Sequence, residues 1–83
     1  MDVKEAVQKG ALELANLIDV PAQHFLLEEV ESFREGGKAY WSVTFSYPAR
    51  GGPIFPPARE YKTVQLDAET GEFKAIRIKT LAQ

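Results

Sequence analysis

The stretch AYWSVTFSY, residues 39–47, alternates apolar and polar side chains without a break. Alternation with a period of two is typical of a β-strand that has one buried face. The two sets are Trp41, Val43, Phe45 and Tyr47 on one side, and Tyr40, Ser42, Thr44 and Ser46 on the other. We therefore predict a strand with one apolar face in the core and a second face that is either wet or bound by a partner.

The residues before this strand predict a hairpin. EGGK, residues 35–38, contains two glycines, which supply the positive φ angles that a tight turn needs. LLEEVESFRE, residues 26–35, is then the first strand, although its alternation breaks at the adjacent Glu28 and Glu29. We expect a β-bulge at this break. We also expect an edge strand, because charged side chains at an edge discourage pairing with other chains.

Two further strands are expected after residue 59. The third runs from about Glu60 to Leu66 and the fourth from about Phe73 to Leu81, with DAETGE, residues 67–72, as the turn between them. In that turn Asp67 accepts hydrogen bonds from the backbone and Gly71 takes the left-handed conformation. The apolar side chains expected to point inward are Val64, Leu66, Ile76 and Ile78.

Residues 2–18 have the pattern of an amphipathic helix. Asp2 and Glu5 have the spacing of a capping box at its start. The expected buried stripe is Val3, Val7, Ala11, Leu14 and Ile18, widened by Ala6, Ala15 and Leu17. Gly10 lies mid-helix, which indicates close packing on a sheet, and residues 21–25 are either a loop or a short helical turn. The predicted fold is therefore α+β: one N-terminal helix packed on a four-stranded antiparallel meander sheet.

The composition limits the class of protein. The 83 residues suffice for one domain, residues 1–83, and they include no cysteine, which excludes disulfides and cysteine-based metal sites. The net charge is −2, with −5 on residues 1–35 and +3 on residues 36–83. No run of Lys or Arg forms the dense basic patch of a nucleic-acid-binding protein. The charged N-terminus is typical of neither a signal peptide nor a membrane span, so we expect a cytoplasmic protein without a nucleic-acid or membrane partner.

YKTVQLDAETGEFKAIRI, residues 61–78, resembles the C-terminal signature of PepSY domains, in which a strand ends in an Asp-x-x-Thr-Gly turn and a last strand follows. GKAYWSVTF, residues 37–45, is similar to the earlier PepSY strand, and the alanine-rich N-terminal helix also fits. Small cystatin-like immunity proteins of bacterial toxin systems are a second resemblance. Both resemblances imply a helix-on-sheet domain that inhibits or modulates a partner protein, and neither supplies a catalytic residue.

A proline-rich loop, PARGGPIFPPAR at residues 48–59, interrupts the alternating pattern. Its prolines restrict the backbone, which lowers the entropy lost when a partner binds. Ile54 and Phe55 lie between Arg50 and Arg59, and apolar anchors beside arginines are common at protein interfaces. Two interpretations remain open: a partner buries Ile54 and Phe55, or Phe55 folds back over the open end of the core.

The polar face of the sheet is the second candidate surface. If the strand parities hold, it gathers Tyr40, Ser42, Thr44, Ser46, Tyr61, Thr63, Gln65, Arg77 and Lys79. Such a face is either an ordinary solvated face or a docking face for a second copy or for an acidic partner.

No motif predicts catalysis, a metal site or a cofactor. His24 is the only histidine and has no partner motif around it. The acidic run at residues 28–35 fits a solvated edge better than a cation site, and Asp67 with Glu69 lacks the spacing of an EF-hand. We therefore expect a non-enzyme.

The leading hypothesis is a small non-catalytic protein-interaction module that binds and inhibits or modulates a partner. The expected partner is a protease, a toxin or a regulator, or a second copy of the chain. The candidate binding residues are Arg50, Ile54, Phe55, Arg59, Tyr40 and Tyr61. The alternative is a small-molecule or peptide-binding domain that uses the polar outer sheet face.

Overall fold

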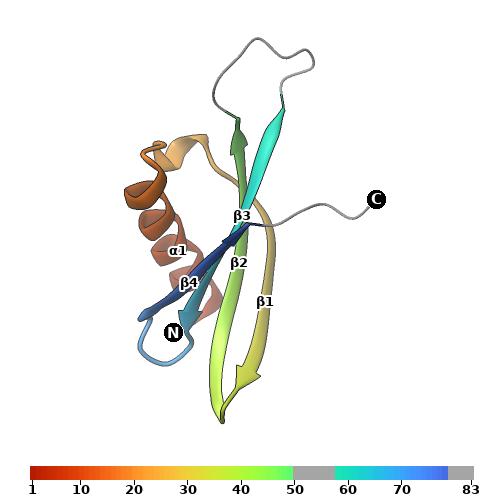
Figure 1. Cartoon of the computed structure of the whole chain (residues 1–83). Helices are drawn as coiled ribbons and strands as arrows, with labels where there is room; N and C mark the ends of the chain where they lie inside the picture. Colours follow the sequence, from red (N-terminus) through yellow and green to blue (C-terminus); the bar gives the residue numbers. More distant parts are fainter. Residues whose placement is uncertain (50–57, 79–83) are drawn as a thin grey trace.

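The computed structural model describes residues 1–49 and 58–78. Its elements, in chain order, are α1 (Val3–Ile18), the short 3₁₀ helix η1 (Ala22–His24), β1 (Leu26–Glu35), β2 (Lys38–Pro48), β3 (Arg59–Asp67) and β4 (Phe73–Ile78). The four strands form one antiparallel sheet in the order β1-β2-β3-β4, and α1 packs against one of its faces (Figure 1). The predicted α+β layout of one helix on a four-stranded meander is confirmed.

The first turn of α1 has the predicted capping box. The Asp2 carboxylate accepts a hydrogen bond from the Glu5 backbone N–H at 2.8 Å, and the Asp2 N–H donates to the Glu5 carboxylate at 3.0 Å. These bonds satisfy two of the donors that a helix start leaves free. The helix ends at Asp19, whose φ of 56° is left-handed. No helix within the described residues is long and apolar enough to cross a membrane.

The β1–β2 hairpin has the geometry that its sequence predicts. Gly36 and Gly37 have φ angles of 59° and 81°, as a two-residue turn with positive φ requires. The pairing register shifts between Leu27 and Glu29, which confirms the bulge expected at the adjacent glutamates. Glu28 is therefore the extra residue of β1, without a direct partner on β2.

The core lies between α1 and the inner face of β2 and β3. Its buried apolar residues are Ala6, Leu14, Val20, Val43, Phe45, Tyr47, Val64 and Leu66. Phe25, just after η1, closes one end, because its ring lies 5.6 Å from that of Phe45 and 5.7 Å from that of Tyr47. Burying side chains of this kind stabilises the fold by about 1.5–3 kcal/mol each for the larger ones.

Gly10 marks the closest approach of helix and sheet. A Cβ atom at this position would lie 3.3 Å from Cε2 of Phe45 and 3.7 Å from Cβ of Val43. The glycine therefore lets α1 settle directly on β2, which confirms the close packing predicted from its place in the helix.

Some apolar residues that were expected inside are exposed. Ile78 is 77% exposed although it pairs with Lys62 on the helix side, because α1 lies over β2 and β3 and the end of β4 extends beyond it. Val3 and Leu17 of the predicted helix stripe are 47% and 63% exposed. The expectation of burial was wrong for these three. Trp41 is only partly buried, and its indole N–H donates to the Met1 carbonyl at 3.2 Å.

The strands next to the proline-rich loop are longer than predicted. Pro48 pairs with Arg59, so β2 and β3 each take one residue from the segment 48–59. A proline is accepted at this position because β1 begins beside Ser46, which leaves Pro48 with a strand neighbour on one side only. The predicted continuation of the fourth strand from residue 79 to Leu81 lies outside the described residues.

Candidate interaction surface

The face of the sheet turned away from α1, called the outer face below, is the larger candidate surface. No other element within residues 1–49 and 58–78 covers it. The register arranges its side chains in rows that cross the four strands. The middle row runs from Glu29 on β1 through Thr44 and Thr63 to Arg77 on β4.

The centre of the outer face is buried although no described element covers it. Thr44 is 3%, Ser46 0% and Thr63 8% exposed. The expectation of a wet face is therefore wrong for its centre, and binding of a partner to this face stays a prediction. The Thr44 and Thr63 hydroxyls form a hydrogen bond of 2.8 Å, so both buried polar groups have a partner.

A chain of polar contacts connects β1, β2 and β3 at one end of this face. The Ser46 hydroxyl donates to the Glu28 carboxylate at 2.6 Å and accepts from Nε of Arg59 at 3.0 Å. Nη2 of Arg59 is buried and has no hydrogen-bond partner among the described residues. A buried donor without an acceptor costs about 1–3 kcal/mol.

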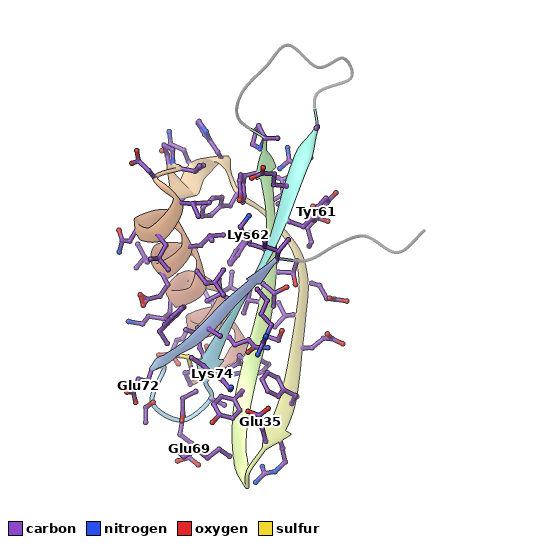
Figure 2. The ribbon with its side chains drawn as sticks, viewed as in Figure 1. Glu35, Tyr61, Lys62, Glu69, Glu72 and Lys74 are labelled. Atoms are coloured by element: carbon purple, nitrogen blue, oxygen red, sulfur yellow. The ribbon has the colours of Figure 1, made fainter. Side chains whose placement is uncertain are left out.

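The opposite end of the outer face is built around Tyr40. Its ring stacks on Phe33 at 5.2 Å, and Nζ of Lys74 lies 5.2 Å from the ring centroid. Lys74 also forms an ion pair of 3.0 Å with Glu35 across the sheet. Figure 2 shows Glu35 and Lys74 at this end and Tyr61 toward the other. These contacts hold the aromatic rings in place and leave them partly exposed.

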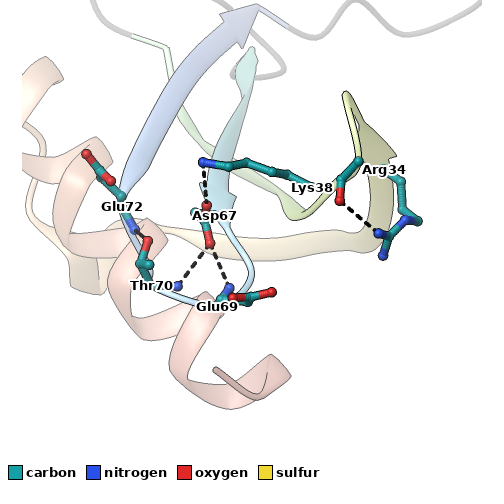
Figure 3. A network of polar contacts seen from close by, with 7 residues as sticks. Arg34, Lys38, Asp67, Glu69, Thr70 and Glu72 are labelled. Atoms are coloured by element: carbon teal, nitrogen blue, oxygen red, sulfur yellow. Dashed lines mark hydrogen bonds and ion pairs between the residues drawn. The ribbon is translucent and has the colours of Figure 1, made fainter.

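The turn between β3 and β4 is organised by Asp67, as the sequence predicts (Figure 3). Its carboxylate accepts hydrogen bonds from the backbone N–H of Thr70 at 3.0 Å and of Glu69 at 2.8 Å. These two bonds lower the pKa of the Asp67 carboxyl, and the Lys38 ammonium 4.0 Å away lowers it further. Gly71 has a φ of 78°, which confirms its predicted left-handed conformation. The two hydrogen bonds of the Asp67 carboxylate thus hold the turn, and its ion pair connects the turn to Lys38 of β2.

The structure brings three of the six predicted binding residues onto one face. Arg59, Tyr61 and Tyr40 all lie on the outer face. Tyr40 and Tyr61 occupy opposite ends, about 20 Å apart at about 3.3 Å per residue along the strands. Arg59 was predicted as a loop residue, yet it belongs to β3 and bonds to Ser46. Arg50, Ile54 and Phe55 lie outside the described residues.

Sequence reasoning missed Glu28 as a partner of this face. An unbroken β1 would turn Glu28 and Glu29 to opposite sides of the sheet. The bulge instead lets Glu28 reach Ser46 while Glu29 faces Thr44. The adjacent glutamates predicted the bulge. A bulge changes the direction of the side chains around it, and this change was the signal that could have predicted the contact between Glu28 and Ser46.

His24 and Asp67 were the candidates for chemistry. His24 is exposed at the end of η1, and no cluster of three metal-ligating side chains occurs within the part of the chain that the structure describes. Hollows of about 130 and 140 Å³ flank Asp67 at the Tyr40 end of the sheet, and both are small beside the ~300–1,000 Å³ of most ligand pockets. A third hollow, of about 300 Å³, is lined by Val20, Pro21, His24, Pro48 and Ala49, and His24 is its one ionisable lining residue among those described.

Comparisons with known proteins do not extend this description. No family model matches the chain, and no significant match was found among curated proteins or solved structures. The similarity to PepSY domains and to cystatin-like immunity proteins therefore stays a prediction from the motifs in residues 37–45 and 61–78.

Proposed function

We propose that this chain is a small non-catalytic protein-interaction module, which binds a partner protein through the outer face and inhibits or modulates it. The observation that carries the proposal is the buried Nη2 of Arg59, a cationic donor without an acceptor among the described residues, beside a sheet face that none of them covers. Because this nitrogen is buried, a partner's carboxylate or backbone carbonyl would reach it only after the side chains around it move, and it would then remove the cost of leaving the nitrogen unpaired.

The segment between β2 and β3 supports the same proposal. The Ala49 N–H donates to the Ala58 carbonyl at 3.0 Å, so the hairpin holds both ends of residues 50–57 together beside Arg59. Ile54 and Phe55 remain candidates for apolar anchors, with Arg50 four residues before Ile54 in the sequence. Large apolar side chains and arginines dominate the binding energy of many interfaces.

The partner class follows from the resemblance to PepSY domains and bacterial immunity proteins. We expect a protease, a toxin or a regulator in a bacterial cytoplasm. The motifs in residues 61–78 support this expectation.

Affinity purification from the native host tests the proposal. The variants are Arg59→Met, which removes the guanidinium donors and keeps the aliphatic stem, and the double variant Ile54→Ser/Phe55→Ser. Lys9→Met is the matched control, because Lys9 is an exposed cation of α1. Each variant is first checked for folding by thermal unfolding.

The proposal expects one captured protein that is lost with Arg59→Met and retained with Lys9→Met. Loss with Ile54→Ser/Phe55→Ser as well would extend the interface to the loop. An identical captured set for the wild type and Arg59→Met would contradict the proposal.

A further inference from the structure

The outer face has a negative edge and a positive edge. Glu29 and Glu31 of β1 lie on this face, beside Thr44 and Ser42 of β2. Arg77 of β4 lies on the same face, beside Thr63. Glu29 and Arg77 end the same row, about 14 Å apart at a strand spacing of ~4.8 Å. One sheet face therefore carries opposite charges on its two borders.

The side chains on the outer face also differ in length between the two central strands, so the height of the surface above the sheet changes from β2 to β3. In two of the rows a serine of β2 stands beside a longer side chain of β3: Ser42 beside Gln65, and Ser46 beside Tyr61. In the middle row Thr44 stands beside Thr63, which has the same size. At the Tyr40 end the difference is reversed, because Tyr40 of β2 stands beside the shorter Asp67 of β3.

We infer that the outer face binds a second copy of this chain, as a homodimer whose twofold axis runs parallel to the strands between β2 and β3. The inference rests on the proposed function and names the partner and the orientation. In a twofold interface, residue i of one copy contacts residue j of the other, and j contacts i in return. Charge and height can therefore be compared row by row.

With the axis parallel to the strands, every row of one copy lies over the same row of the second copy. The order of the strands along the row is reversed, so β1 lies over β4 of the second copy and β2 lies over its β3. Glu29 then lies over Arg77 of the second copy, and Arg77 over its Glu29. Gln65 lies over the second copy's Ser42, and Tyr40 lies over its Asp67, so a longer side chain faces a shorter one in both rows. Opposite charges and complementary heights meet in the same orientation.

With the axis perpendicular to the strands, each strand would face its own copy. Glu29 would then lie near the second copy's Glu29, and Arg77 near its Arg77. Tyr61 would face the long Gln65 of the second copy, and Ser46 the short Ser42. Like charges and mismatched heights therefore oppose this second orientation.

The size of the face predicts a weak, reversible dimer. Four strands about 4.8 Å apart and about eight residues long cover about 500 Å², or about 1,000 Å² for both copies. This is near the lower limit of specific interfaces, where transient complexes are found. Salt is expected to weaken it, because the charged edges are solvent-exposed.

Charge exchange tests the inference by sedimentation equilibrium. Arg77→Glu places acid over acid on both sides of the axis, and Glu29→Arg places base over base. We expect each variant alone to associate at least about 10-fold more weakly than the wild type. An equimolar mixture of the two is expected to regain wild-type association, because each edge then meets its opposite. The double variant Glu29→Arg/Arg77→Glu is expected to dimerise by itself.

Lys9→Glu is the matched control, because it reverses an exposed charge on α1 and is expected to leave association unchanged. A wild type that stays monomeric at its highest soluble concentration would overturn the inference, as would variants whose mixture stays monomeric. If the wild type is monomeric and Arg59→Met still loses a captured protein, the homodimer is wrong and the proposed function stands. If the capture is unaffected by Arg59→Met, the proposed function fails whatever the association state.

Discussion

The hydroxyl oxygens of Thr44 and Thr63 lie 2.8 Å apart, buried at the centre of the sheet face that α1 does not cover. Their hydrogen bond crosses the two central strands in the middle row. A buried polar pair on an open face is stable only while both partners remain, because each hydroxyl satisfies the other.

Thr44→Val is expected to destabilise the protein by about 1–2 kcal/mol, because it leaves the Thr63 hydroxyl buried without its partner. The double variant Thr44→Val/Thr63→Val removes both polar groups and keeps the shape, so it is expected to be closer to the wild type. Urea unfolding at low protein concentration measures both. Additive losses in the double variant would show that the hydroxyls do not depend on each other.

Gly71→Ala is expected to cost about as much stability as Gly36→Ala. Both positions have positive φ, 78° and 59°, so each substitution carries a backbone strain of about 1 kcal/mol. A Cβ on Gly71 would meet the end of the flexible Met1 side chain, which can move aside at little cost, whereas Gly36 has open space around it. Thermal unfolding of the two variants measures both losses, and a much larger loss for Gly71→Ala would show that Met1 is held against the turn.

Gly10→Leu is expected to destabilise the fold by at least about 2 kcal/mol, because a large side chain would separate α1 from Phe45 and Val43. Gly10→Ala is the control, expected within about 1 kcal/mol of the wild type. Its gain in helix propensity offsets a contact of 3.3 Å with the Phe45 ring. Chemical unfolding checks both, and a Gly10→Leu variant as stable as the wild type would contradict the close approach.

Because the pKa of Asp67 is lowered in the folded protein, we expect part of the free energy of unfolding to be lost at acid pH. The Thr70 and Glu69 N–H bonds lower its pKa in the folded state, so the stabilisation is present above the unfolded pKa and is lost as the pH falls through the folded value. The stability difference between the wild type and Asp67→Asn should therefore be constant between about pH 5 and 8 and shrink below about pH 4. Urea unfolding over this range measures it. A difference that persisted unchanged in acid would show that the carboxylate charge has no role.

The helix, the strands and the turns were predictable because each depends on local chemistry. The capping box at Asp2, the paired glycines at 36 and 37 and the alternation in residues 39–47 each act over a few residues. The exposure of Ile78 was not predictable, because it depends on where the edge of α1 falls over the sheet.

The candidate surface was predicted in part. Strand parity correctly grouped Tyr40 and Tyr61 with the threonines. It missed the burial of Thr44, Ser46 and Thr63, because strand parity tells which face a side chain is on and not how far its neighbours cover it. The contacts of Ser46 with Arg59 and with Glu28 depend on the strand register and on the side-chain direction that the bulge gives Glu28, which were not predicted.

The most direct test of the outer face as a surface that binds a second copy of the chain is a dilution series followed by two-dimensional amide NMR of the wild-type chain. The account predicts concentration-dependent shifts at Glu29, Thr44, Thr63 and Arg77, with the α1 residues around Lys9 unchanged. Shifts confined to α1, or spectra that do not change with concentration, would contradict binding of a second copy to this face.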